Sequence, residues 1–583
     1  MKLKVYLLVL NVILIIGCSS DNNEEPQTPD PKGSLEVTVI TSDGEAIEGA
    51  VVTTTPTTQQ LTTGPTGKVL FENLDIGNYE VSVLVPFELE PIEEVVSIEA
   101  DKTAEVLILG LDVIEPTPID LSFLITQTYN LLKGDFLFDA GGFGLYWGDI
   151  GTDLAYVNPG NFTVFNDLDT YNFTAGNNTV LKVWADHYKA IRMVNLGLDA
   201  IEDDNYNKDQ PINEGVAAAQ FRFLRALLYF NLVKIYGNPV VVTTAKIDLQ
   251  NPPTAIQGMD ETYQLIENDL IFAEANLEAN APSNRASVPV AQALLGKVYL
   301  QMAGFPLLQN DKYALALAQF NKLTGVFGLE TNYADIFSLT NETSTTEVIF
   351  RIDFDANDIN TSGNYGVLWG PQGISIHDYL LLAPGFPESF FEIPANIVSP
   401  VTFPLDIEDS RFAQNIAAFT LDNGNAANAT EISDWRPYKF RKDTALPVVA
   451  NGESFDLPYL RYADVLLMLA EAENAINGPT AIAYEAVNQV RRRAFGDNLN
   501  DLPAGLSQQE FLEAILKERS LELCFEGHRK DDLVRTQQLQ SVVESFNLSN
   551  PQNTKNYEPH KYIWPIPQEE LNFNQGATQN PGY

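Results

Sequence analysis

The sequence predicts a mainly α-helical protein in which a helical domain with long loops follows a small all-β sandwich domain. Two patterns predict this class. Between residues 34 and 112 apolar and polar residues alternate as in half-buried strands, and from residue 119 onward apolar residues recur at the spacing of amphipathic helices. The length agrees, because 583 residues exceed one ordinary domain and their 45% hydrophobic content suits a large packed interior.

The first seventeen residues have the features of a bacterial lipoprotein signal peptide. Two lysines within Met1–Lys4 precede the almost wholly apolar run Val5–Ile16, which is too short to cross a bilayer but suits a secretory signal. The letters IIGC at its end resemble the lipoprotein cleavage box. This resemblance implies that Cys18 is lipidated and becomes the first mature residue, held by acyl chains in the membrane. The alternative is a plain signal peptide with an incidental cysteine.

Residues 18–33 are predicted to form an acidic, flexible tether. From Ser19 to Gly33 the chain has no apolar residue and three prolines, so it has nothing with which to build a core. The early letters SDNNEE resemble the acidic export tag of Bacteroidetes lipoproteins. The resemblance implies an outer-membrane protein that faces the outside of the cell.

Residues 34–112 are predicted to form the β-sandwich. The alternating runs LEVTV and YEVSVLV are separated by glycine-containing turns, as in small sandwiches. Three segments resemble the carboxypeptidase-regulatory-like, or transthyretin-like, fold: Asp43–Val52, Thr66–Leu74 and Gly77–Val83. We interpret the domain as a spacer, with contact to a glycan or a partner as the alternative. Residues 113–118, which contain two prolines, are the expected linker.

Residues 119–583 are predicted to form helices in adjacent pairs. One segment places a single apolar stripe along a helix, with Val183, His187, Ile191, Val194 and Leu198. Another ends at Gly237 with Pro239 beyond it, a typical helix end. Pairs of this size, with small residues where neighbours must approach, indicate hairpins of the tetratricopeptide type, although the period is irregular. Long insertions are expected at about 134–178, 340–457 and 540–583.

Six blocks in this region resemble the SusD/RagB outer-membrane lipoproteins of Bacteroidetes. They are Phe221–Val241, Tyr333–Ile352, Leu460–Gly478, Val487–Ala494, Ile515–Thr536 and Trp564–Tyr583. The resemblance implies a SusD-like helical fold and a surface protein that covers a SusC-like TonB-dependent barrel. Such a protein captures an oligosaccharide or polysaccharide for import and performs no chemistry on it. The β domain departs from the family pattern, in which the helical domain begins soon after the anchor.

Paired carboxylates in the block ERSLELCFEGHRKDDLVR raise the alternative of a glycosidase. Glu518 and Glu522 share a helix face, and Asp531 adjoins Asp532. Four basic residues lie close by in the sequence: Arg519, Arg529, Lys530 and Arg535. Such neighbours lower carboxylate pKa values, whereas a glycosidase acid needs a raised pKa. We therefore expect an ion-paired helix junction with Gly527 as the helix stop, and no enzyme.

Composition argues against several other classes of protein. The net charge of −43 repels nucleic acid. The four histidines form no cluster with cysteines, so we expect no metal site and no cofactor; His187 is expected in the core, and Cys524 as a buried thiol. The segment Asp353–Asn364 begins like a calcium loop but lacks the glycine and glutamate at its sixth and twelfth positions, which favours a plain polar loop.

The ligand contacts are predicted in two aromatic loops, because sugar binding needs flat rings for C–H faces and polar groups for hydroxyls. The loops are Gly141–Asn178 and Asn360–Tyr379. The candidates are Trp369, Tyr365, Tyr171, Trp147, Tyr156, Phe173, Asn172 and Asn161, with Trp369 and Tyr365 foremost. The alternative is that these residues only pack their own loops. Trp184 and Trp564 are assigned to the core.

The expected function is therefore capture of a glycan at the cell surface and its delivery to a SusC-like transporter. The acidic charge favours a neutral glycan over a uronate or a sulfated one. The main alternative is a surface binding protein for peptides or another non-sugar nutrient in the same type of importer.

Overall fold

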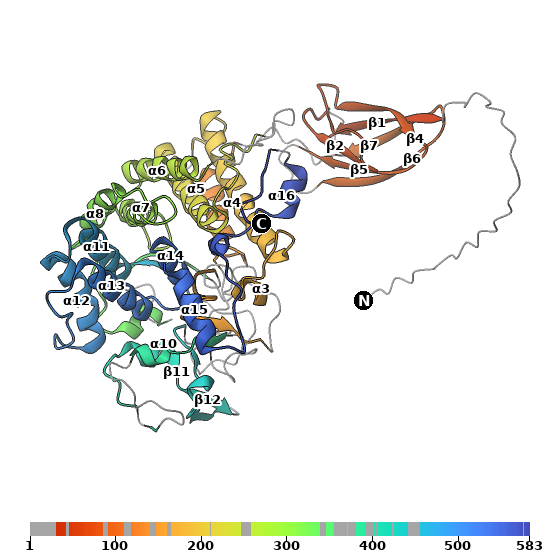
Figure 1. The fold of residues 1–583 in the computed structure, drawn as a ribbon. Coiled ribbons are helices and arrows are strands. Elements are labelled where there is room, and N and C mark those ends of the chain that lie inside the picture. The colour runs from red at the N-terminus through yellow and green to blue at the C-terminus, as the bar shows by residue number, and fades with distance from the viewer. Residues whose placement is uncertain are drawn as a thin grey trace, which may run out of the picture. The chain divides into compact units, whose positions relative to one another are not determined.

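The chain divides into two compact units, Met1–Thr117 and Pro118–Tyr583 (Figure 1). The computed structural model describes residues 31–41, 46–85, 91–109, 118–134, 136–138, 147–159, 165–209, 212–246, 258–338, 346–354, 370, 380–390, 402–403, 405–422, 425–440, 455–574 and 576–583.

The first unit consists of two facing β-sheets. In one sheet, β1 (Lys32–Ile40) lies between β4 (Lys68–Asp75), antiparallel to it, and β7 (Thr103–Leu109), parallel to it. The other sheet is antiparallel, in the order β3 (Leu61–Thr62), β2 (Val51–Thr55), β5 (Gly77–Leu84) and β6 (Ile92–Ile98).

The predicted alternation of apolar residues builds the core of this unit. Leu35, Val37 and Val39 of β1 are completely buried, and the residues between them are not. Val81 and Val83 of β5 face the same cluster from the other sheet. The all-β prediction is confirmed. The more specific likeness to the carboxypeptidase-regulatory-like fold stays a prediction.

The second unit is mainly helical, as predicted. Its α-helices are α1 (Leu121–Leu131), α3 (Asn166–Asp169), α4 (Asn178–Glu202), α5 (Glu214–Tyr236), α6 (Met259–Asn276), α7 (Val288–Ala303), α8 (Lys312–Leu323), α10 (Arg411–Asn415), α11 (Tyr462–Asn477), α12 (Ala481–Phe495), α13 (Gln508–Glu522), α14 (Arg529–Arg535), α15 (Leu539–Ser549) and α16 (Gln568–Phe573). Single 3-10 turns are η1 (Tyr333–Phe337), η2 (Pro387–Phe390), η3 (Ile432–Asp434) and η4 (Pro559–Tyr562).

Short antiparallel ribbons connect the helices of this unit. They pair β8 (Ala155–Val157) with β10 (Leu380–Leu382), β9 (Val348–Ile352) with β15 (Leu457–Arg461), β11 (Ile416–Ala417) with β14 (Arg436–Pro437), and β12 (Phe419–Asp422) with β13 (Asn425–Asn428).

Successive helices pack as neighbours from α4 to α8, after which α8 packs on α11 and α11 packs on α12 and α13. Figure 1 shows these helices as a row of adjacent rods running from yellow to blue. Small residues allow the close approach, as expected. A Cβ atom added at Gly197 of α4 would lie 2.2 Å from the ring of Phe221 on α5. The predicted helix hairpins are therefore present, with long segments between α8 and α11.

Helix α5 forms the centre of the core. By length and composition it could cross a membrane, but 89% of its apolar window is buried inside the protein, as in the core helix of a globular unit. Asn213 caps its first turn by accepting from the backbone amides of Gly215 and Val216, and Gly237, at φ 73°, ends it where predicted.

The last predicted insertion contains a helix that was not expected. Helix α15 buries Leu539, Val543 and Phe546, which recur at helical spacing. The predicted insertion at about 540–583 therefore includes most of this helix, which the sequence pattern did not indicate.

Candidate functional site

The two loops predicted to bind the ligand are joined by a β-ribbon. Leu380, Leu381 and Leu382 of β10 pair with Val157, Tyr156 and Ala155 of β8. The amide of Ala383 also donates to the carbonyl of Leu154, at 3.0 Å. Loops more than two hundred positions apart in the sequence therefore meet at one place in the fold.

The direction of the strands decides to which end of the ribbon each loop segment is attached. Because the strands are antiparallel, the chain that leaves Val157 and the chain that enters Leu380 are attached to the same end of the ribbon. Asn161 belongs to the first segment, and Tyr365 and Trp369 belong to the second. These three candidates lie outside the described residues, so their role as ligand contacts stays a prediction.

Tyr156 lies on the ribbon itself and is half-buried. Its ring meets Phe546 edge to face, with centroids 5.3 Å apart, and Lys555 lies 5.8 Å from its centroid. Burial raises the pKa of its phenol above the ordinary value. Tyr156 is thus held in place by α15 while part of its side chain remains accessible.

The other aromatic candidates that the structure describes are covered by protein. Tyr171 is 0% exposed and donates to the carbonyl of Gly151 at 2.9 Å. Phe173 and Trp147, also buried, both pack on Trp564, with centroids 6.0 and 5.3 Å apart. Their environment fits the alternative of local packing, because no sugar reaches a ring without solvent access. Trp184 and Trp564 are buried, as predicted.

Asn172 is the exposed member of the described candidates. Its carbonyl oxygen accepts from the amide of Asn556 at 2.9 Å, and its own amide donates to the hydroxyl of Thr170 at 3.0 Å. Asn172 therefore connects the first loop to the segment around Asn556, which precedes η4.

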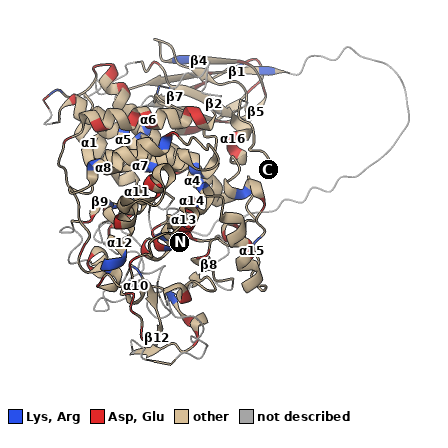
Figure 2. Ribbon diagram, turned by 60° about the vertical axis from the view of Figure 1, so that its left-hand side comes forward, with Lys and Arg blue, Asp and Glu red and all other residues tan. Residues whose placement is uncertain are grey.

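The carboxylates that suggested a glycosidase are buried in ion pairs. Arg411 donates to Glu518 at 2.6 Å, and Arg461 and Arg493 each donate to Glu522 at 2.5 Å. Burial alone would raise the pKa of Glu522, but Arg493, Arg461 and Arg411 outweigh it and hold this pKa well below its usual range. The predicted ion-paired junction is confirmed. Figure 2 shows basic residues in blue and acidic residues in red on the helices of this region.

The second pair of carboxylates, Asp531 and Asp532, also forms ion pairs inside the fold. Lys234 pairs with Asp531 at 2.5 Å, and Arg519 pairs with Asp532 at 2.7 Å. Burial would raise the pKa of Asp532, but Arg519 and Arg535 lower it to about 2. Glu522 and Asp532 therefore have lowered pKa values, whereas a proton donor to a glycosidic oxygen requires a raised pKa.

One detail of the junction differs from expectation. Helix α13 ends at Glu522, before Gly527. Gly527 instead takes φ 79° in the turn that leads to α14, where its amide donates to Asp149 at 2.8 Å. A Cβ atom at Gly148 would lie 2.1 Å from the Gly527 backbone, so two glycines allow this contact.

The basic partners of the junction were missed by sequence reasoning. Arg411, Lys439 and Arg461 come from other parts of the chain, and each reaches Glu522, Glu526 or both. No pattern in the sequence places them beside α13. Their number explains why so many acids can be buried there.

Histidine and cysteine occupy the expected core positions. Nδ1 of His187 lies 2.7 Å from the carbonyl oxygen of Val183, and Cys524 is buried. Asp353, the first residue of the calcium-like segment, accepts from the amide of Asn284 at 2.7 Å. Within the described ranges, no group of three His, Cys, Asp or Glu side chains could hold a metal ion.

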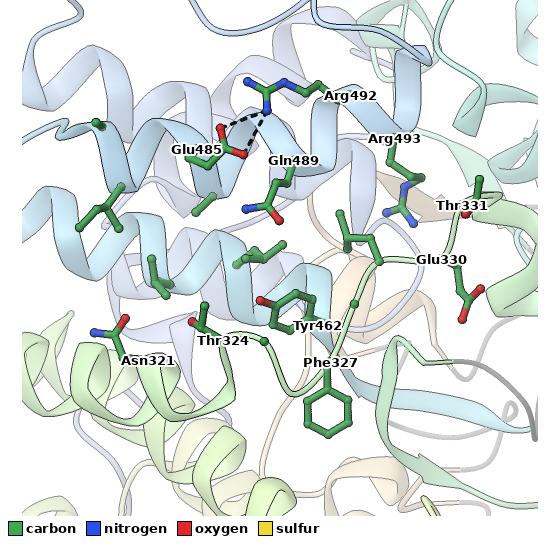
Figure 3. A pocket seen from close by; sticks show the side chains of 18 of the residues that line it. Asn321, Thr324, Phe327, Glu330, Thr331, Tyr462, Glu485, Gln489, Arg492 and Arg493 are labelled. Carbon is green, nitrogen blue, oxygen red and sulfur yellow. Dashed lines mark hydrogen bonds and ion pairs between the residues drawn. The ribbon is translucent and has the colours of Figure 1, made fainter.

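Two surface hollows lie beside elements of the helical unit, one at the ribbon and one between helices. One, of about 390 Å³, lies at the Ala155–Leu382 end of the ribbon and has Asp153, Ser389 and Lys517 in its wall. The other, of about 930 Å³, lies between the end of α8, α11 and α12 (Figure 3). The sequence pattern indicated neither, because both depend on how distant elements pack.

Two family models match the helical unit. The model described as SusD family matches residues 414–583, and the model described as starch-binding associating with outer membrane matches residues 146–300.

Curated relatives and a solved structure extend the likeness over most of the chain. SusD-like protein P25 of Formosa agariphila is 28% identical over 515 residues, which are 80% of this chain and 92% of that protein. Starch-binding protein SusD of Bacteroides thetaiotaomicron is 25% identical over 67% of this chain and 78% of its own. The crystal structure of a SusD homolog from Bacteroides thetaiotaomicron superposes with a TM-score of 0.69 at 26% identity, covering 81% of this chain and 99% of that one.

Proposed function

We propose that this protein binds glycans at the outer membrane. Both family models and these relatives support its membership of the SusD/RagB family. One observation carries the proposal: the likeness to SusD-like proteins extends over about 80% of the chain and 92% of a relative's length. A likeness of that extent is far longer than a shared motif. One of the similar proteins has a name that states that it binds starch.

The ligand site that we propose lies at the end of the β8–β10 ribbon. The ribbon attaches the segment with Asn161 and the segment with Tyr365 and Trp369 to the same end. Tyr156 adds a half-buried ring on the ribbon itself. Aromatic faces there would stack on the C–H face of a sugar, and amides would bind its hydroxyls.

The ligand in this proposal is a neutral oligosaccharide or polysaccharide. The net charge of −43 gives the protein a field that repels uronates and sulfated sugars. A neutral sugar binds through short-range contacts, so we expect its affinity to change little with salt concentration.

The cell-surface location rests on the start of the chain. A short apolar run that ends at Cys18 and continues into an acidic tether is typical of a surface lipoprotein. Held by Cys18, the protein would deliver its glycan to a SusC-like TonB-dependent barrel.

The role is capture without chemistry. The acids that could serve a glycosidase, Glu522 and Asp532, have lowered pKa values and are enclosed by arginines. A carboxylate in that state does not donate a proton near neutral pH.

Isothermal titration with neutral oligosaccharides and with peptides tests the choice of ligand. We expect at least one glycan to bind, peptides not to bind, and the bound glycan to gain no new reducing ends on incubation. Binding of peptides alone would favour the alternative nutrient, and new reducing ends would show an enzyme.

Single substitutions locate the site. Trp369→Ala and Tyr365→Ala are expected to weaken binding roughly 10-fold or more, because one stacked ring contributes about 1 to 2 kcal/mol. The matched control is Phe573→Ala, which removes an 86% exposed ring on α16. Unchanged affinity in both loop variants would show that Trp369 and Tyr365 do not contact the glycan.

A further inference from the structure

The hollow between α8, α11 and α12 has the size and shape of a ligand site. Its volume of about 930 Å³ falls at the upper end of the usual range for small-molecule pockets, about 300 to 1,000 Å³. The turn after α8 forms one wall and α12 forms the other, with α11 between them (Figure 3). None of its lining residues belongs to the β8–β10 ribbon.

The floor of the hollow is apolar and includes an aromatic ring. Leu466 and Leu469 of α11 and Ala486 of α12 line it. Tyr462 lies beside them at the start of α11, and its ring is tilted by 34° from that of Phe327, with centroids 6.5 Å apart. The ring of Tyr462 is only 5% exposed, so its hydroxyl, which makes no hydrogen bond to the described residues, is the part that a ligand in the hollow can contact.

A buried donor without a partner lines the same hollow. The side chain of Arg493 is only 4% exposed, and its two terminal nitrogens pair with Glu347 and Glu522. Its Nε–H has no hydrogen-bond partner among the described residues. This nitrogen has almost no accessible surface, so a ligand in the hollow cannot reach it, and its cost of about 1 to 3 kcal/mol belongs to the ion-paired junction.

Two amides on the wall are also available. Gln489 of α12 and Asn321 of α8 line the hollow, as Figure 3 shows. Neither side chain makes a hydrogen bond to another residue in the described part of the chain. Each amide offers both a donor and an acceptor, the combination that binds hydroxyl groups.

The two guanidinium charges in the wall of the hollow are already compensated. Glu347 and Glu522 neutralise Arg493, while Glu485 and Asp501 neutralise Arg492. No guanidinium is left to attract an anion. The groups that remain available are two neutral amides and the Tyr462 hydroxyl, while the carboxylate of Glu330, which accepts from Thr346, disfavours an anion, so the hollow suits an uncharged ligand rich in hydroxyls.

We propose that this hollow is a second saccharide site, separate from the ribbon end, which binds a neutral sugar through the hydroxyl of Tyr462 and the amides of Gln489 and Asn321. The choice of a sugar rests on the proposed function. The separate location rests on the geometry of the hollow itself.

Titration of the intact protein and its variants with maltoheptaose, laminariheptaose and cellohexaose tests the second site. We expect two binding events with the same sugar, of which one remains in the Trp369→Ala variant. Gln489→Ala and Tyr462→Phe each remove one polar group and should weaken the remaining event about 3- to 10-fold. Gln540→Ala, on the exposed face of α15, should leave both events unchanged.

Hydrogen exchange with the same sugars locates the second event. We expect slower exchange in peptides covering residues 321–331 and 481–496, with the Trp369→Ala variant behaving as the unmodified protein does there. Binding that Trp369→Ala abolishes, or a second event insensitive to both Gln489→Ala and Tyr462→Phe, would overturn the second site and leave the proposed function intact.

The converse outcomes separate the two proposals. Binding that responds only to Gln489→Ala and Tyr462→Phe would uphold the hollow and overturn the ribbon end as the main site. Absence of binding to all three sugars, with peptide binding in their place, would overturn both.

Discussion

At the scale of single residues, buried charge decides what the acidic block around Glu522 can do. Glu522 is completely buried and contacts three guanidinium groups, those of Arg411, Arg461 and Arg493. Removing water from a carboxylate costs several kcal/mol unless such partners replace it. The acid that looked most catalytic in the sequence therefore holds segments of the helical unit together.

Glu522→Gln is expected to destabilise the protein by about 3 to 5 kcal/mol, because it leaves buried arginines without their counter-charge. Chemical denaturation monitored by circular dichroism measures the change. Glu513→Gln is the matched control on the same helix, where the side chain is exposed and accepts only from Gln509. Equal stability of the two variants would contradict this account of the junction.

Asp149 gives a second residue-scale prediction, in pH dependence. Burial raises the pKa of its carboxyl from 3.8 to about 8, despite the hydrogen bond from the amide of Gly527. Between these values the folded protein holds a proton that the unfolded chain has released. Stability from this group is therefore full below about pH 4 and is lost as the pH rises towards 8.

Asp149→Asn should remove that loss, because asparagine does not ionise. We expect the free energy of unfolding of the variant, relative to the unmodified protein, to rise by roughly 2 kcal/mol between pH 5.5 and 7.5. Denaturation at both pH values measures it. A difference that is the same at both would show that Asp149 ionises normally.

At the scale of elements, the helix hairpins depend on glycines where helices touch. Gly197→Ala would push a methyl group into the ring of Phe221, 2.2 Å from the new Cβ. Overpacking of this kind costs about 1 to 3 kcal/mol, of which the better helix propensity of alanine returns up to about 1. Thermal unfolding should therefore show a lowered melting temperature.

Gly176→Ala is the control, since its Cβ would meet nothing closer than the Thr174 hydroxyl at 4.0 Å. A melting temperature lowered equally by both substitutions would mean that packing against Phe221 is not the cause.

Much of the element pattern could be predicted from the sequence, because it depends on neighbours along the chain. The stripe through Val183 and Ile191 lies on α4, and Gly237 ends α5 where expected. Helix α15 was missed because its apolar positions are few and lie in a polar segment.

The site was less predictable, since burial depends on distant parts of the chain. Tyr171 and Phe173 look like exposed loop aromatics in sequence, yet Tyr557 and Trp564 cover them. The pairing of β8 with β10 and the hollow beside α12 depend in the same way on contacts between segments far apart. No local pattern contains that information.

At the scale of the whole molecule, each unit has its own hydrophobic core. The cluster of Leu35, Val37 and Val81 belongs wholly to the first unit, and the core around α5 belongs wholly to the second. The ligand site and the second hollow that we propose both lie in the second unit. A spacer role for the β unit therefore stays a prediction.

Residues 118–583 expressed alone should fold cooperatively and bind the same glycan with an affinity within about 2-fold of the longer chain, because no proposed contact comes from the β unit. Calorimetry measures folding, and titration measures binding. Loss of glycan affinity in a well-folded shortened chain would assign the β unit a part in recognition.

The central claim is that the protein captures a neutral glycan. Affinity electrophoresis of the mature protein in gels that contain starch, laminarin or another neutral polysaccharide tests it most directly. The account predicts that at least one neutral polysaccharide slows the protein and that sulfated or uronate polymers do not. Migration that is unchanged in every neutral gel but slowed by a polyanion would contradict it.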